Sequence, residues 1–194
     1  MTSHLGGHNN ITHTDSGVLK YFYNKLNCKS MLDVGCGPAG NVFIARSIGY
    51  NAIGIDGDKT LVEDQRELNI IIHDYTEGKL PTHLYWTINF SILKPPELNV
   101  DLIYSTEFLE HVEEKYLDNV FDTFSMGKYI CITHALPHET GGHHHVNCQS
   151  EQYWIDKFDQ YGFDFSPSHT GQIRVASTMS RNFMSNTGKV FVKR

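Results

Sequence analysis

Hydrophobic positions along this chain fall into two alternating kinds of segment, short continuous runs and longer stretches with helical spacing. The short runs are typical of strands buried on both faces, and they occupy Met31–Val34, Ala52–Ile55, Ile70–Ile72, Asp101–Tyr104 and Tyr129–Thr133. The segments with helical character lie between or after them, at Asn41–Ile48, Lys59–Leu68 and Glu107–Phe124. This alternation predicts an α/β fold, a Rossmann-like doubly wound sheet with helices on both faces.

The C-terminal part departs from that alternation. A helix is predicted over Ser150–Tyr161, with Ser150 as its N-cap and Gly162 as its stop. Val175–Met179 and Lys189–Val192 resemble strands, and too few residues separate them for a crossover helix, so they are predicted to pair as an antiparallel hairpin. We therefore expect a mixed sheet, mostly parallel with an antiparallel C-terminal hairpin strand.

Length and composition predict one domain that needs no membrane. The 194 residues suit a single domain, which we divide into an N-terminal cap segment (1–29), a cofactor-binding core (30–134) and an acceptor-side loop, helix and terminal hairpin (135–194). The net charge of −6, without a basic run, argues against strong nucleic-acid binding. No apolar run approaches the ~18 to 20 residues of a membrane span.

The first fifteen residues lack the apolar core of a signal peptide, and the four cysteines form no C-x-x-C pair, so we expect a cytoplasmic protein with reduced thiols. The oligomeric state is left open.

A glycine-rich loop follows the first predicted strand. Asp33-Val-Gly35-Cys-Gly37-Pro-Ala-Gly40 stands between a strand and a helix, the context in which backbone approaches a cofactor closely. A dinucleotide would place its pyrophosphate here and use Asp56 for its ribose. The carboxylate of Asp33 would repel a pyrophosphate but attract the ammonium group of S-adenosylmethionine, so the cationic cofactor is favoured.

With these motifs in order, the chain resembles the class I S-adenosylmethionine-dependent methyltransferases over residues 30–134, and the terminal hairpin extends the resemblance. The resemblance implies a methyltransferase that converts S-adenosylmethionine to S-adenosylhomocysteine. It implies that the loop residues Asp33, Gly35, Gly37 and Gly40 wrap the methionine part of the cofactor. It also implies that Asp56 holds the ribose hydroxyls, that Asp74, followed by Tyr75, contacts the adenine, and that the segment 105–112 with Thr106 lines the pocket. Taken singly, Asp56 could cap a helix and Asp74 could be a turn residue.

A histidine-rich segment follows the fifth predicted strand. Loops beyond the carboxyl ends of strands form the ligand crevice in open α/β sheets, so this segment is expected to face the acceptor. His145, His144 and His111 are the candidate catalytic bases for an alcohol or phenol. Two alternatives stay open. His143 and His145 could ligate a divalent metal together with His138 or Glu139, although metal is not favoured, or the loop is simply solvated. Residues 142–147, with Tyr153-Trp154-Ile155, also resemble a small methyltransferase branch found in bacteria and phages.

The sequence says less about the acceptor than about the cofactor. The segment after the fourth strand lacks the Pro-Pro-aromatic pattern of DNA amino-methyltransferases, and no cysteine follows a proline as in cytosine-C5 enzymes. Three segments could hold an acceptor: the N-terminal segment with Tyr21, Phe22 and Tyr23, the stretch Leu80–Leu98, and the histidine-rich loop. Of their aromatic residues, Phe22 and Phe90 are expected to be core residues. A small molecule or sugar is the first choice, with oxygen ahead of nitrogen as the acceptor atom. The alternatives are a cofactor-binding subunit that is inactive or needs a partner, and a methyltransferase acting on RNA or protein.

Overall fold

A computed structural model describes residues 4–61, 70–84 and 99–194. Most of the predicted helix Lys59–Leu68 and most of the predicted acceptor segment Leu80–Leu98 lie outside the described residues.

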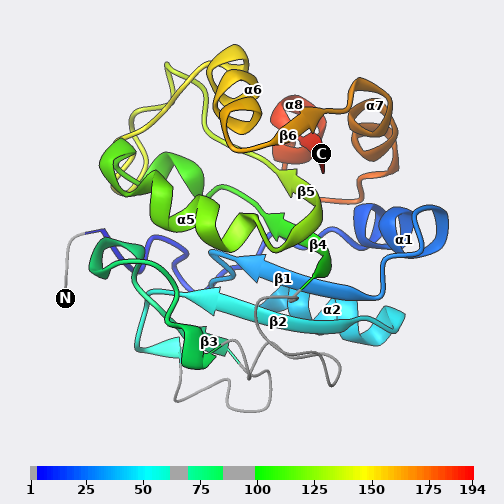
Figure 1. The fold of residues 1–194 in the computed structure, drawn as a ribbon, viewed down its shortest axis with the longest axis horizontal. Helices are drawn as coiled ribbons and strands as arrows, with labels where there is room; N and C mark the ends of the chain where they lie inside the picture. The colour runs from blue at the N-terminus through cyan, green and yellow to red at the C-terminus, as the bar shows by residue number, and fades with distance from the viewer. Residues whose placement is uncertain (1–3, 62–69, 85–98) are drawn as a thin grey trace.

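Seven strands form one sheet in the order β3-β2-β1-β4-β5-β7-β6 (Figure 1). Their bounds are β1 (Ser30–Val34), β2 (Asn51–Asp56), β3 (Ile70–Ile72), β4 (Val100–Ser105), β5 (Gly127–Ile132), β6 (Phe163–Phe165) and β7 (Lys189–Lys193). The first five strands are parallel, and Leu32 of β1 lies in register with Ile53 of β2 and Ile103 of β4. Strand β7 runs antiparallel to both β5 and β6. The predicted mixed sheet is confirmed.

Helices cover both faces of the sheet and bury two hydrophobic cores. The α-helices are α1 (Ser16–Lys25), α2 (Gly40–Ile48), α5 (Leu117–Phe124), α6 (Glu151–Gln160), α7 (Pro167–Ala176) and α8 (Phe183–Thr187). Strand side chains alternate between the faces: Leu32 packs in the core under α5 and α6, whereas its neighbour Met31 packs in the core under α1, α2, α7 and α8. All four cysteines are free thiols.

The predicted helix over Glu107–Phe124 is wrong in its first half. The backbone of Glu107 has φ of +50°, in the left-handed region, and Val112 is extended, so two short 3₁₀ turns, η4 (Leu109–His111) and η5 (Glu114–Tyr116), precede α5. Two similar turns, η2 (Tyr75–Glu77) and η3 (Thr82–Leu84), lie after β3. The segment that carries Glu107, Glu110 and His111 is therefore a folded loop and not a helix face.

The predicted strand Val175–Met179 is also wrong. Ser166 caps helix α7, Pro167 occupies its first turn, and the helix continues to Ala176 with the Val175 side chain 89% exposed. The partner of β7 is instead β6, only three residues long. The antiparallel pairing was predicted correctly and its partner was not.

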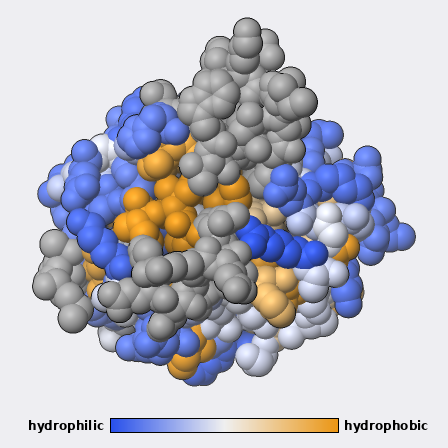
Figure 2. All heavy atoms as spheres, turned by 90° about the horizontal axis from the view of Figure 1, so that it is seen from below, coloured by the Kyte–Doolittle hydropathy of each residue, from blue (hydrophilic) through white to orange (hydrophobic). Residues whose placement is uncertain are grey.

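The face seen in Figure 2 shows hydrophobic side chains between the segments drawn in grey, with hydrophilic side chains around them. Among the described residues, none of the helices is long and apolar enough to cross a membrane.

Candidate active site

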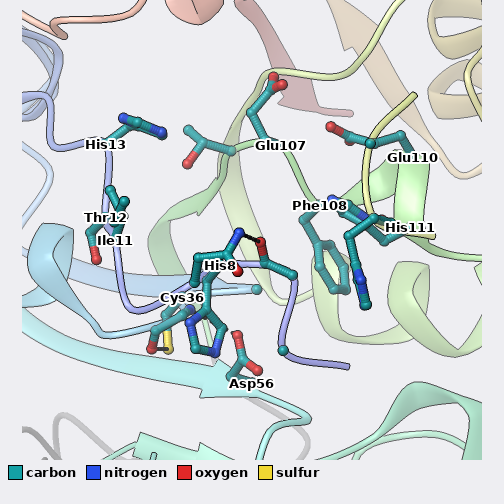
Figure 3. A pocket seen from close by; sticks show the side chains of 18 of the residues that line it. His8, Ile11, Thr12, His13, Cys36, Asp56, Glu107, Phe108, Glu110 and His111 are labelled. Atoms are coloured by element: carbon teal, nitrogen blue, oxygen red, sulfur yellow. Dashed lines mark hydrogen bonds between the residues drawn. The ribbon is translucent and has the colours of Figure 1, made fainter. Parts of the chain in front are cut away.

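A cavity of about 630 Å³ opens where the carboxyl ends of β1, β2 and β4 meet. From β1 the chain passes to β2 and β3 on one side and then returns to β4 on the other side of β1. This reversal of the strand order creates a ligand crevice in open α/β sheets. A second cavity, of about 60 Å³, adjoins the first, and the two share Gly35, Asp56, Phe108 and His111 in their linings. Figure 3 shows the residues around the larger cavity.

The glycine loop forms the floor of this site because neighbouring groups approach its backbone closely. Gly35 has φ of +73°, and a Cβ added there would lie 2.3 Å from the ring of Phe108. The amide of Gly37 donates a hydrogen bond to the Asp56 carboxylate at 2.8 Å. The amide of Gly40, the first residue of α2, donates to the hydroxyl of Thr12 at 3.2 Å. Gly40 lines neither cavity, unlike the other predicted loop residues.

Asp33 is a buried acid at the end of β1. Burial, together with the nearby charge of Asp56, raises its pKa to about 8. Its Oδ2 atom is buried without a hydrogen-bond partner among the described residues, and Asp33 lines the larger cavity. A positively charged ligand group at this position would stabilise the ionised carboxylate. The sequence predicts such a group, the ammonium of the methionyl part of S-adenosylmethionine.

Asp56 and Asp74 stand at the ends of neighbouring strands, as predicted. Asp56 accepts the amides of Gly37 and Asp58, and burial raises its pKa. Burial also disfavours the charge of Asp74, but hydrogen bonds from Thr76 and the imidazole of His4 outweigh burial and lower its pKa. Both acids line the smaller cavity, so their oxygens border the same ligand space.

The two other predicted cofactor residues are also in this region. Thr106 lines the larger cavity, next to the glycine loop. Tyr75 lines the smaller cavity, where it is almost fully buried, and its hydroxyl donates to Thr123 at 3.1 Å. The phenol is therefore held in place by the protein, and its ring forms part of the cavity wall.

The N-terminal segment, which the sequence makes a candidate for holding the acceptor, lines the larger cavity with its residues before α1. His8 contacts Asp58 at 3.2 Å and lies beside Asp56 in Figure 3, while His4 contacts Asp74 at 2.9 Å. The aromatic residues Tyr21, Phe22 and Tyr23 of this segment were also candidate acceptor contacts. The structure buries Phe22 in the core, and the Tyr21 hydroxyl bonds with Nδ1 of His169 at 2.7 Å, so this cluster does not line the cavity. The N-terminal segment therefore borders the cavity through its residues before α1 and not through this aromatic cluster.

Two loops bring acidic and imidazole groups together on another wall of the cavity. Glu107, Glu110 and His111 come from the segment after β4, and His145 comes from the loop after β5. Ligand atoms of Glu110, His111 and His145 all lie within 4.8 Å of one another. The amides of Val146 and Asn147 both donate to the carbonyl of Glu110 at 3.0 Å, so the loop that carries His145 is anchored directly on the turn that carries Glu110. We call Glu110, His111 and His145 the Glu-His-His cluster.

Each imidazole of the cluster is oriented by a backbone carbonyl. Nδ1 of His111 donates to the carbonyl of His143 at 2.7 Å, and Nδ1 of His145 donates to the carbonyl of Glu139. With Nδ1 as the donor, Nε2 of either ring carries a lone pair and no hydrogen whenever that ring is neutral. Burial and the neighbouring His145 lower the pKa of His111 to about 4, so this ring is neutral near pH 7.

The carboxyls of the same wall are tightly packed. Glu110 is fully buried, and neither of its carboxyl oxygens has a hydrogen-bond partner among the described residues. Burial raises its pKa well above the usual range, and the charge of Glu107 adds to this effect. Burial likewise raises the pKa of Glu107. An orphaned buried carboxyl is rare in folded proteins, because nothing compensates for its lost hydration.

The predicted catalytic histidines are separated by the structure. His145 and His111 line the larger cavity, whereas His144 lines only the smaller one, where its ring is tilted against that of His4 with the ring centroids 5.9 Å apart. The metal group considered from sequence does not form. Nε2 of His143 bonds instead to the carbonyl of Leu5, and His138 is exposed and outside the cluster. Alternation along an extended segment cannot apply here, because the backbone of His144 is left-handed, with φ of +49°.

A scan of the sequence against protein-family models gives no match, and a search of curated protein sequences finds none either. The structure, in contrast, matches 547 chains of solved structures. The strand order, the glycine loop after β1 and the acids after β2 and β3 define the class: the chain has the fold of the class I S-adenosylmethionine-dependent methyltransferases.

Three solved structures illustrate this likeness. A magnesium protoporphyrin IX methyltransferase from Synechocystis, with bound S-adenosylhomocysteine, is 13% identical over 91% of this chain and 80% of its own, with a TM-score of 0.60. A TehB-like S-adenosylmethionine-dependent methyltransferase from Corynebacterium glutamicum is 13% identical over 92% and 88%, with a TM-score of 0.59. An S-adenosylmethionine-dependent methyltransferase from Archaeoglobus fulgidus is 16% identical over 91% and 93%, with a TM-score of 0.58. At these identities the likeness defines the fold.

Proposed function

We propose that this protein is an S-adenosylmethionine-dependent methyltransferase that methylates a hydroxyl oxygen of a small molecule or sugar. One observation carries the proposal: a single cavity joins the glycine loop and the acids Asp33 and Asp56 to the Glu-His-His cluster. The first set suits a cationic nucleoside cofactor, and the second suits an acceptor that must lose a proton.

Methyl transfer is an in-line displacement, so the protein must chiefly align donor and acceptor. The acceptor oxygen forms a bond to the methyl carbon while the carbon–sulfur bond breaks. The electron pair of the broken bond stays on sulfur, which gives S-adenosylhomocysteine. The hydroxyl proton leaves to a basic group beside the oxygen. Proton-accepting atoms stand on this wall of the cavity, namely Nε2 of His111 and His145 and the Glu107 carboxylate. An amine acceptor could lose its proton to water, whereas a hydroxyl benefits from such groups, which favours oxygen.

The cofactor side has a matching set of roles. Asp33 would hold the methionyl ammonium group, and the Gly35–Gly37 backbone would lie along the methionyl chain. Asp56 would hold the ribose, and Asp74 with the ring of Tyr75 would border the adenine. The linings of the two adjoining cavities support this order, since Asp33 borders the larger cavity and Asp74 borders the smaller.

The test supplies S-adenosylmethionine with paired acceptors that share a carbon skeleton and differ only in carrying a hydroxyl or an amine. Formation of S-adenosylhomocysteine is followed by mass spectrometry, and the methylated atom is located in the product. We expect turnover with hydroxylated small molecules or sugars. Turnover confined to amines, RNA or protein would contradict the proposed acceptor. Cofactor binding with no turnover on any acceptor class would instead indicate a binding subunit.

A further inference from the structure

We propose that Glu110, His111 and His145 form a site for one divalent transition-metal ion, and that this ion binds the acceptor hydroxyl. Three hydrogen-bond acceptors converge here from two separate loops, their ligand atoms within 4.8 Å of one another. Both oxygens of the Glu110 carboxyl are buried and have no hydrogen-bond partner among the described residues. A convergence of lone pairs without a donor is the pattern expected of a cation site.

The imidazoles are arranged as metal ligands are. A ligating histidine characteristically donates its other ring N–H to a carbonyl or carboxylate, which fixes the ring and directs its lone pair at the ion. Both histidines of the cluster do so: His111 donates to the carbonyl of His143, and His145 donates to the carbonyl of Glu139. A neutral ring at either position therefore keeps a lone pair on Nε2, the nitrogen left for a metal ion.

The backbone holds the third ligand in place. The carbonyl of Glu110 accepts the amides of Val146 and Asn147, and the Asn147 side chain donates to the carbonyl of Val112 at 3.1 Å. These bonds tie the histidine-rich loop to the turn after β4 at the position of the ligands. For metal–ligand bonds of ~2.1 Å, ligand atoms lie roughly 3 to 4 Å apart, so a small inward movement of the three side chains would close the site.

The donor set indicates the kind of ion. Two imidazoles and one carboxylate suit first-row divalent ions such as Mn²⁺, Fe²⁺, Co²⁺ or Zn²⁺, whereas Mg²⁺ prefers oxygen ligands throughout. Three protein ligands leave coordination positions open, and the cluster faces the larger cavity. Glu107 lines the same cavity beside the cluster.

The role of the ion rests on the proposed methyltransferase function, whereas its binding does not. An ion at the cluster would orient an acceptor oxygen and make its hydroxyl more acidic. His111 and His145 would then act as ligands, and the selectivity for oxygen over nitrogen would come from the ion. The acceptor class this implies is a molecule with a hydroxyl, or two adjacent hydroxyls, that can coordinate a metal.

The experiment measures metal binding alone, on the full chain after chelator treatment and without S-adenosylmethionine. Co²⁺ is titrated by its visible absorption, and Mn²⁺ and Zn²⁺ are titrated by calorimetry. The variants are Glu110→Gln, His111→Ala and His145→Ala. His138→Ala and His143→Ala are the matched controls, because they remove histidines of the same loop that lie outside the cluster. Thermal unfolding with and without metal is recorded for every variant, so that loss of binding is distinguished from loss of folding.

We expect one Co²⁺ per chain in the wild type, and affinity lowered about tenfold or more in each cluster variant but unchanged in both controls. Metal should raise the unfolding temperature of the wild type and of the controls only. Absence of binding in the wild type, or equal binding by the folded cluster variants, would overturn the site. Loss of binding in His138→Ala or His143→Ala would move it elsewhere in the loop. S-adenosylmethionine binding measured on the same samples reports on the proposed function separately, since the metal titration is made without S-adenosylmethionine.

Discussion

Substitution of Gly35 by alanine tests the packing at the centre of the site. Two costs can be worked out from the structure. The backbone φ of +73° places the new side chain in the left-handed region, at about 1 to 2 kcal/mol. The added Cβ would also lie 2.3, 2.5 and 2.8 Å from three atoms of Phe108, an overpacking that costs about 1 to 3 kcal/mol when the neighbour must shift. Gly35→Ala should therefore lower the free energy of unfolding by about 2 to 5 kcal/mol.

The assay is urea unfolding, with two matched glycine controls. Gly162 has φ of +86° and nothing within 4 Å of an added Cβ, so Gly162→Ala should show the backbone cost alone. Gly141 has neither a positive φ nor a neighbour within 4 Å, so Gly141→Ala should change little. Because Phe108 lines both cavities, Gly35→Ala should also weaken S-adenosylmethionine binding. If Gly35→Ala is no more destabilising than Gly162→Ala, the close approach of Phe108 is wrong.

Two further predictions concern the acids of the cofactor side. Asp56→Ala should weaken S-adenosylmethionine binding by about tenfold or more, because a charge-assisted contact to the ribose is lost; unchanged affinity by calorimetry would remove Asp56 from the site. For Asp33, the folded-state pKa of about 8 exceeds the ordinary value of 3.8, so the folded state keeps a proton that the unfolded state loses. The tighter proton binding by folded Asp33 stabilises the cofactor-free protein fully below pH 3.8, and this stabilisation is lost as the pH rises from 3.8 to about 8. Urea unfolding across this range should show a weaker pH dependence in Asp33→Asn, and an identical one would contradict the burial of the acid.

The parallel half of the fold was predictable because its signals are local. Runs such as Met31–Val34 are continuously apolar, and a strand buried on both faces needs little else. The errors arose where tertiary contacts decide. Val175 has the residue type of a strand, but Ser166 and Pro167 start a helix upstream that carries it. Strand β6 is three residues long and acquires its structure by pairing with β7, so its own sequence carries little signal.

The candidate site was predictable on the side where motifs are contiguous. Asp33, Gly35, Gly37 and Asp56 lie at strand ends whose positions follow from the topology, and the structure brings them to one cavity. The acceptor side depends on two loops meeting, which spacing cannot show. Glu110 and His145 are far apart in sequence, and their proximity follows from the bonds of Val146 and Asn147 to the Glu110 carbonyl. Glu107 and Glu110 would face solvent on a regular helix, and they reach the cavity because that helix does not form.

The central claim is that the cavity holds S-adenosylmethionine. The most direct measurement is a calorimetric titration of the purified protein with S-adenosylmethionine, S-adenosylhomocysteine and NAD, before and after chelation. The first two ligands should bind with micromolar affinity, before and after chelation alike, and NAD should not bind. Binding of NAD alone would contradict the assignment of Asp33 to a cationic group and with it the proposed function.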